Sequence, residues 1–206
     1  MKNQKVADYY DKVYSEDEKA FSGEPLPLVK VLTEHLSSGS ILEIGAGAGR
    51  NSLYLSSKGY KVLATDISSL AVERLKNTAS SSGIKLEAEV ADAAEKDLRG
   101  DFDAIICTYT FHHLITEDAE LVINRMQQHT KPHGFNLITT FTKNGDFYKN
   151  NPSTTNFYLD NKEQLENLYK GWNIIKSFEK KGQARALDTN GKPQFNVFAG
   201  LLAQKL

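Results

Sequence analysis

The sequence has one cysteine, almost no net charge and no long apolar run, and each of these absences excludes a class of protein. Cys107 is the single cysteine among 206 residues, which excludes an intramolecular disulfide or a paired-cysteine metal site and fits a reducing compartment. The net charge is −1, and no run of Lys or Arg exceeds two residues. A nucleic-acid partner would require a basic surface, so we expect none.

No stretch reaches the roughly 18 apolar residues of a membrane span, and the first eight residues lack the apolar core of a signal peptide. The chain has 40% hydrophobic and 25% charged residues, an ordinary composition for one globular domain over residues 1–206. We therefore expect a cytoplasmic monomer or homodimer that acts on a small molecule, without a membrane contact and without a metal site.

Three alternate glycines in residues 40–51 form the most informative motif. A short apolar run at residues 41–44 ends at Gly45, Gly47 and Gly49, after which a helical pattern begins. This order predicts a strand, a tight loop and a helix. Such a loop brings the backbone close to a ligand and directs unpaired N–H groups at it.

Short apolar runs and helical patterns alternate through the middle of the chain. We predict strands at residues 41–44, 61–65, 85–90, 102–107 and 135–141. The predicted helices follow residue 25, Gly49, Ser68 or Ser69, and Thr116, and the last of them cannot pass Pro132. This alternation predicts an α/β fold, a doubly wound, mostly parallel sheet of the Rossmann-like kind.

The last third of the chain has a different pattern. A capping-box pattern at residues 160–163 predicts a helix that ends at Gly171. Two strand-like runs follow, at residues 172–178 and 194–203, and Asn190-Gly191 between them predicts a hairpin. Residues 144–156 are the one candidate for a long loop.

Residues 1–22 are polar and rich in tyrosine and acidic residues, so they form a helix or a loose arm but no core of their own. Two interpretations remain open. The aromatic side chains pack on the surface of the domain, as terminal segments commonly do, or the arm forms a lid over the ligand.

Two classes of cofactor use a glycine-rich turn after the first strand, namely dinucleotides and S-adenosylmethionine. A dinucleotide loop requires a small residue at its sixth position, where this chain has Arg50. Glu43 lies inside the preceding strand, where a carboxylate would repel a pyrophosphate and suits a cationic ligand. The motif therefore favours a sulfonium cofactor.

With this glycine motif, the sequence resembles the class I S-adenosylmethionine-dependent methyltransferases. The resemblance continues through Asp66, Asp92, residues 111–114 and residues 131–134. It implies a seven-stranded sheet of order 3-2-1-4-5-7-6, in which Asp66 accepts the ribose hydroxyls and Asp92 accepts the adenine amino group. Taken singly, each acid is equally well explained as a charge at a helix N-terminus.

The resemblance also implies the set of residues that bind S-adenosylmethionine. The glycine-loop backbone would lie under the methionine part of the cofactor. The expected cofactor-binding residues are Tyr14, Glu43, Gly45, Ala46, Gly47, Arg50, Asn51, Asp66, Ile67, Asp92, Ala93 and Thr108.

Within this class, residues 49–55, 126–138, 169–172 and 188–191 are similar to the bacterial tellurite-resistance methyltransferases. That family transfers methyl groups to oxyanions and related species of tellurium and selenium. Where the family has a His-Arg pair and a further Arg in the tail hairpin, this chain has Arg185, Ala186 and Pro193. The resemblance therefore implies the methyl donor more strongly than the methyl acceptor, which is either such an oxyanion or a thiol-like molecule.

His112, His113 and Arg185 are the candidate residues on the acceptor side. A hydroxyl or amine acceptor requires proton removal, for which either histidine is suitably placed, whereas a soft anion requires no base. The alternative interpretation is that one histidine caps or packs against the helix that starts near Thr116, and that Arg185 is a solvated charge on the hairpin. Two other functions remain open: a sensor that binds the cofactor without turnover, and a dinucleotide oxidoreductase.

Overall fold

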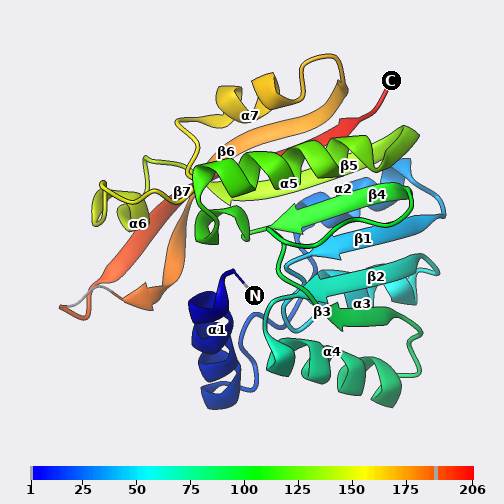
Figure 1. Cartoon of the computed structure of the whole chain (residues 1–206), viewed down its shortest axis with the longest axis horizontal. Coiled ribbons are helices and arrows are strands. Elements are labelled where there is room, and N and C mark those ends of the chain that lie inside the picture. Colours follow the sequence, from blue (N-terminus) through cyan, green and yellow to red (C-terminus); the bar gives the residue numbers. More distant parts are fainter. Residues whose placement is uncertain (1, 188–189) are drawn as a thin grey trace.

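A single sheet organises the fold, with its strands in the order β3-β2-β1-β4-β5-β7-β6 (Figure 1). The structure is a computed structural model, and it describes residues 2–187 and 190–206, without the side chains of Arg185 and Ala186. Strands β1 to β5 pair in parallel, and β7 pairs antiparallel with both β5 and β6. The expected fold class and strand order are confirmed. The strands are β1 (Ser40–Ile44), β2 (Lys61–Asp66), β3 (Glu87–Val90), β4 (Phe102–Thr108), β5 (Thr130–Phe141), β6 (Asn173–Leu187) and β7 (Pro193–Gln204).

Helices cover both faces of the sheet because the central strands bury apolar side chains on both sides. One core joins α5 and α7 to alternate residues of the strands such as Leu42 and Ile105, and a second joins α2 and α3 to Ile41 and Ile106. The helices are α1 (Gln4–Glu16), α2 (Pro27–His35), α3 (Arg50–Ser57), α4 (Ser69–Ser81), α5 (Thr116–Gln128), α6 (Asp146–Lys149) and α7 (Lys162–Leu168), with a 3-10 turn η1 (Phe111–His113).

The polar N-terminal segment forms α1, which packs beside α4 at the ends of the strands (Figure 1). The carboxylate of Asp11 accepts hydrogen bonds from the hydroxyls of Ser68 and Ser69 and from the N–H of Leu70, at the start of α4. At the C-terminal end of α1, the guanidinium of Arg74 donates to three backbone carbonyls. The helix is thus fastened to α4 near its middle and at its C-terminal end.

Several element boundaries differ from the prediction. β5 begins at Thr130 and passes through Pro132, because the register with β4 shifts between Phe102 and Ala104 and no ladder N–H is required at the proline. α5 begins at Thr116 itself, so that residue is not its cap. The capping side chain of α7 is Asn161, the second residue of the predicted box.

β6 is longer than predicted, since it continues nine residues past Phe178 to Leu187. The added part, residues 179–187, is rich in charged residues, and the far end of the β6–β7 hairpin extends beyond the other strands, on the same side as α1 (Figure 1). The predicted hairpin is confirmed by the pairing of Leu187 with Pro193.

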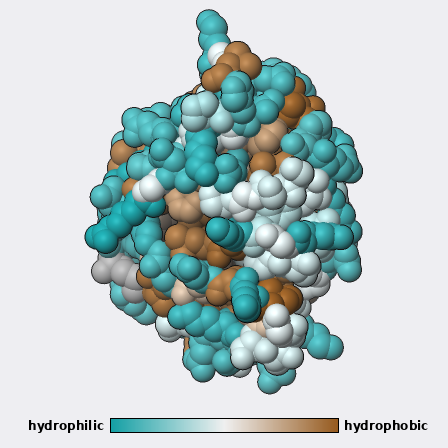
Figure 2. Space-filling model, turned by 90° about the vertical axis from the view of Figure 1, so that its right-hand side faces the viewer, coloured by the Kyte–Doolittle hydropathy of each residue, from teal (hydrophilic) through white to brown (hydrophobic). Residues whose placement is uncertain are grey.

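Hydrophilic side chains dominate the end of the sheet where the parallel strands begin, with a few apolar residues between them (Figure 2). Within the described residues, none of the helices has the length and apolar character needed to cross a bilayer.

Candidate active site

A cleft of about 1470 Å³ opens at the carboxyl ends of β1, β2 and β4. α1 covers one side of it, and residues of the β6–β7 hairpin and of the segment 147–158 form the opposite wall. This is the edge at which ligands bind in open α/β sheets. Of the twelve predicted cofactor residues, eleven line the cleft, together with His112 and His113.

The glycine loop has the conformation that only glycine adopts easily. Gly45, Gly47 and Gly49 have φ values of 71°, 56° and 89°. A Cβ on Gly45 would lie 2.0 Å from Thr110 Oγ1, and one on Gly47 would lie 2.6 Å from the hydroxyl of Tyr14. Thr110 and Tyr14 therefore pack directly against the loop backbone, which leaves no room for a side chain at either glycine.

Asp66 ends β2 and holds the glycine loop. Its carboxylate accepts hydrogen bonds from the N–H of Gly47 at 2.7 Å and from the N–H of Ser68 at 2.9 Å. Burial raises the pKa of Asp66 above its ordinary value, while these N–H donors oppose the rise. Each carboxylate oxygen keeps a further lone pair, so Asp66 has acceptor capacity for two hydroxyl groups on the cleft side.

Asp92 follows β3 and is only 4% exposed. Its carboxylate accepts three hydrogen bonds, from the backbone N–H and the side-chain amide of Asn3 and from the N–H of Ala94. Asn3 directly precedes α1, so the N-terminal arm reaches across the cleft to the acid that the sequence assigns to adenine.

Glu43 is the predicted cofactor residue that does not line the cleft. It is 1% exposed and accepts hydrogen bonds from Asn51 Nδ2 at 2.8 Å and from the hydroxyl of Ser52. Burial raises the pKa of Glu43 to about 7. Any effect of Glu43 on a ligand therefore passes through Asn51, which lines the cleft and also accepts the N–H of Leu26.

Tyr109 is a cleft residue that the sequence analysis missed. Its φ of 56° is unusual for a residue with a large side chain and is one kind of strain that occurs at functional sites. The guanidinium of Arg50 lies over the Tyr109 ring, 6.0 Å from its centroid. The position directly after β4 is the only signal in the sequence that points to this residue.

His112 and His113 lie in η1, with their ring centroids 3.8 Å apart. Burial lowers the pKa of His113 to about 4 and the pKa of His112 well below its ordinary value, so both rings are neutral near pH 7. The hydroxyl of Tyr10 in α1 lies 2.6 Å from His113 Nε2. Neither side chain caps α5, because no side chain caps that helix.

Aromatic rings dominate the wall opposite α1, and the sequence analysis did not identify them. The ring of Phe141 lies 4.7 Å from His112, 5.4 Å from Tyr109 and 5.4 Å from Phe147, between centroids. Their neighbours in the cleft include Phe198 and Asn196 of β7. Arg185 belongs to β6 by its backbone, but its side chain lies outside the described residues.

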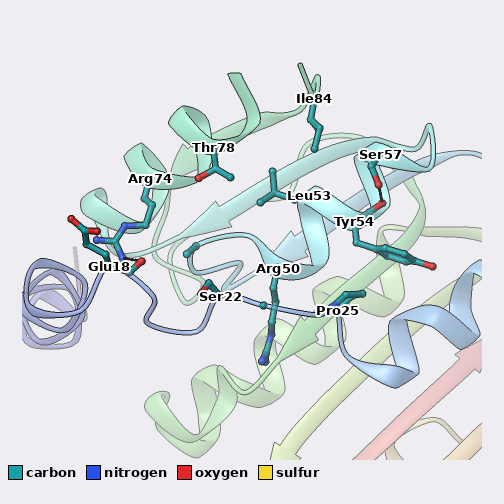
Figure 3. Close-up of a pocket in the computed structure, with 12 residues that line it drawn as sticks. Glu18, Ser22, Pro25, Arg50, Leu53, Tyr54, Ser57, Arg74, Thr78 and Ile84 are labelled. Carbon is teal, nitrogen blue, oxygen red and sulfur yellow. Dashed lines mark hydrogen bonds between the residues drawn. The ribbon is translucent and has the colours of Figure 1, made fainter. Parts of the chain in front are cut away.

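A second pocket of about 400 Å³ lies between the end of α1, α3 and α4 (Figure 3). In this view Arg74 extends from α4 towards Glu18, and Arg50 extends in a different direction. The guanidinium of Arg74 already donates to the carbonyls of Tyr14, Asp17 and Glu18. At this pocket, the hydrogen bonds of Arg74 therefore hold the end of α1 against α4.

Two expected absences concern metal and thiol chemistry. Among residues 2–187 and 190–206, no group of three or more His, Cys, Asp or Glu is arranged to hold a metal ion. Cys107 is fully buried in β4, and burial raises the pKa of its thiol to about 12. The thiol therefore stays protonated and packs as a small apolar side chain.

The family model described as "Tellurite resistance protein TehB" matches residues 3–202. The chain belongs to this family. The probable S-adenosyl-L-methionine-dependent methyltransferase TehB of Haemophilus influenzae strain 10810 is 29% identical over 201 residues, which cover 98% of this chain and 67% of the relative. A crystal structure of TehB from Haemophilus influenzae superposes with a TM-score of 0.79 at 27% identity, over 97% of this chain and 67% of that one.

The fold is also similar to that of magnesium protoporphyrin IX methyltransferase from Synechocystis PCC 6803, crystallised with bound S-adenosylmethionine. That likeness has a TM-score of 0.68 at 15% identity and covers 99% of this chain and 97% of the other, and it concerns the fold alone. The expected resemblance to class I methyltransferases is confirmed, and the chain is an S-adenosylmethionine-dependent methyltransferase by family. The dinucleotide oxidoreductase considered from the sequence is excluded by the same finding.

Proposed function

We propose that this member of the TehB family transfers a methyl group from S-adenosylmethionine to a small molecule with a soft nucleophilic atom. The candidate acceptors are oxyanions and related species of tellurium and selenium, which the family resemblance implies, and thiol-like compounds. The observation that carries the proposal is the joint position of Asp66, Asp92 and the glycine loop on one cleft. A cytoplasmic location, a monomeric or homodimeric state and the lack of a nucleic-acid partner stay predictions.

The residues around the cleft fit the cofactor chemically. Gly45 and Gly47 line the cleft without side chains, so the loop backbone itself would face the cofactor. Asp66 would accept the ribose hydroxyls, Asp92 would accept the adenine amino group, and Arg50 would pair with the amino-acid carboxylate. Tyr14, Ala46, Asn51, Ile67, Ala93 and Thr108 complete the proposed surface.

When bound, S-adenosylmethionine supplies a methyl group on a sulfonium sulfur, for an in-line displacement that leaves S-adenosylhomocysteine. The protein has to align the acceptor and exclude water, which is worth up to about 7–11 kcal/mol in model reactions. α1 supports both tasks, since Tyr10 and Tyr14 cover the cleft from above. His113 and His112 are neutral, but their lowered pKa makes both rings weak bases, which would suit an acceptor that has no proton to lose.

The test measures release of S-adenosylhomocysteine from S-adenosylmethionine with selenite, tellurite and a set of thiols as acceptors. We expect at least one of these compounds to produce S-adenosylhomocysteine well above the rate without an acceptor. Tight binding of S-adenosylhomocysteine with no turnover of any acceptor would point instead to a sensor. Absence of S-adenosylhomocysteine binding would contradict the proposal altogether.

A further inference from the structure

Six side chains form one continuous wall on the side of the cleft that faces away from the glycine loop. We call it the acceptor wall, and it consists of Tyr109, His112, Phe141, Phe147, Asn196 and Phe198. The Phe141 ring lies at its centre, next to the rings of His112, Tyr109 and Phe147, and Tyr109 lies 5.6 Å from Phe198. The four rings of Tyr109, Phe141, Phe147 and Phe198 are each only partly buried, so they present apolar surface to the cleft.

Asn196 brings a hydrogen-bond donor without a partner into this wall. Its Oδ1 accepts the N–H of Phe147 at 2.9 Å, which fixes the orientation of the amide. The other end, Nδ2, is buried and has no hydrogen-bond partner, although the residue is 98% buried and lines the cleft. A buried donor without a partner is costly. Because Nδ2 is closed to solvent in this structure, a ligand that moves the surrounding rings apart would gain a hydrogen bond there.

His112 contributes a second unpaired atom to the same wall. Its Nδ1 is buried without a partner, and the residue is only 9% exposed. Asn156 Nδ2 donates to the backbone carbonyl of His112 at 2.9 Å, which holds η1 in place. The acceptor wall therefore combines aromatic surface with two neutral polar groups, Asn196 Nδ2 and His112 Nδ1.

Charge separates the two ends of the cleft. The described residues that line it between positions 141 and 198 are all uncharged, whereas Asp66, Asp92, Glu16 and Asp17 line it elsewhere. The described cations on the cleft are Lys5 and Arg50, and Arg50 is assigned to the carboxylate of the cofactor. Arg50 lies over the Tyr109 ring at the edge of the acceptor wall, and with Arg50 assigned to the cofactor, a doubly charged oxyanion would meet no second described cation at the wall.

We propose that the acceptor wall binds an uncharged, flat, ring-bearing acceptor, which stacks against Phe141 and Phe147 and accepts a hydrogen bond from Asn196 Nδ2. This inference rests on the proposed function and narrows its acceptor to a heteroatom carried on a neutral ring. The backbone makes room for the arrangement at Gly145, where a Cβ would lie 2.7 Å from Asn196 Oδ1. Aromatic pairs and edge-to-face contacts favour such a ring over a small hydrated anion.

The test compares benzamide, benzoate and selenite on protein saturated with S-adenosylhomocysteine. Benzamide and benzoate share one shape, but only benzamide is uncharged with a carbonyl oxygen that Asn196 Nδ2 matches. Binding of benzamide is followed by ligand-observed NMR, and the two anions are added as competitors. We expect benzamide to bind at least about tenfold more tightly than benzoate and selenite to cause no displacement.

Two variants connect the binding to the wall. Asn196→Asp keeps the acceptor for the Phe147 N–H but replaces the donor, and Phe147→Leu removes a ring from a short peripheral helix. Each should weaken benzamide by at least about fivefold and leave S-adenosylhomocysteine binding within about twofold of wild type. The exposed Asn151→Asp, in the same segment and off the cleft, is the matched control.

The outcomes separate this inference from the proposed function. If selenite or benzoate binds as tightly as benzamide, if benzamide does not bind, or if neither variant weakens it, the acceptor wall does not select a neutral ring. If wild-type protein does not bind S-adenosylhomocysteine, the proposed function is wrong, and so is the role inferred for the acceptor wall.

Discussion

Asn3 contacts the carboxylate of Asp92 twice, through its backbone N–H at 2.9 Å from Oδ2 and through its side-chain amide at 3.0 Å from Oδ1. The N–H of Ala94 is a third donor, 3.0 Å from Oδ1. Asp92 is the acid proposed to accept the adenine amino group. The N-terminal arm and the cofactor therefore compete for the same acceptor.

This competition gives the first prediction. Replacing Asn3 with Ala removes the side-chain amide that donates to Asp92. The Asp92 carboxylate then has one acceptor site more for the adenine amino group. We expect Asn3→Ala to bind S-adenosylhomocysteine roughly threefold to tenfold more tightly, as calorimetry would measure. Gln4→Ala, one residue along in α1, is the control, because Gln4 is exposed and its side-chain amide donates to Asp8. Weaker binding by Asn3→Ala would mean that Asn3 supports the cofactor.

The second prediction concerns Asp66. Asp66→Ala removes the proposed ribose acceptor and also the group that holds the Gly47 N–H at 2.7 Å. We expect the binding free energy of S-adenosylhomocysteine to weaken by about 1.5–3 kcal/mol, the range for hydrogen bonds to a charged group. The exposed Asp97→Ala serves as the comparison. An affinity that does not change in Asp66→Ala would rule out the proposed position of the ribose.

The fold could be predicted because its central strands are short apolar runs that end at glycine, aspartate or threonine. β1 and β2 are buried on both faces, so their composition alone identifies them. The ends of β5 and β6 could not be predicted in the same way. β5 passes Pro132 only because its register with β4 shifts, and the outer half of β6 is more polar because it pairs with a part of β7 that lies beyond β5.

The two sides of the candidate site differ in how far the sequence predicts them. Asp66 and Asp92 directly follow strands, and parallel strands bring such positions to one edge of the sheet. Phe147 and Asn196 come from a short helix in a loop and from a hairpin strand, 49 residues apart. Their contact depends on how the hairpin folds over the loop, and no local pattern indicates that.

The third prediction concerns pH and Glu43. Burial raises the pKa of Glu43 from 4.5 to about 7, so the folded state holds this proton more tightly than the unfolded state. The stability that this carboxyl contributes is complete below pH 4.5 and is lost as the pH rises to about 7. Glu43→Gln should therefore gain stability relative to wild type between pH 5 and pH 8.

The expected gain is about 2–3 kcal/mol in the free energy of unfolding, since one pKa unit corresponds to about 1.4 kcal/mol. Urea unfolding of both proteins at the two pH values gives the difference directly. Glu95→Gln, at an exposed position, is the control: it shows how far the loss of any carboxylate changes the free energy of unfolding. Equal pH dependence in Glu43→Gln and wild type would contradict the raised pKa.

The fourth prediction tests how α1 is held over the cleft. The guanidinium of Arg74 donates to the carbonyls of Tyr14, Asp17 and Glu18, at the end of α1 where unpaired carbonyls accumulate. Arg74→Met keeps much of the side-chain length but removes all three hydrogen bonds. We expect amide hydrogen exchange in α1 to accelerate by at least about tenfold, because α1 then opens more often.

If α1 has to open before the cofactor leaves, the same variant should also release S-adenosylhomocysteine faster, as stopped-flow dissociation would measure. Lys76→Met on the exposed side of α4 changes the charge equally without touching α1, so both rates should stay as in wild type. Faster exchange with unchanged release would show that the cofactor leaves by a route that α1 does not cover. Unchanged exchange would show that the hydrogen bonds from the start of α4 to Asp11 of α1 are sufficient to hold the helix.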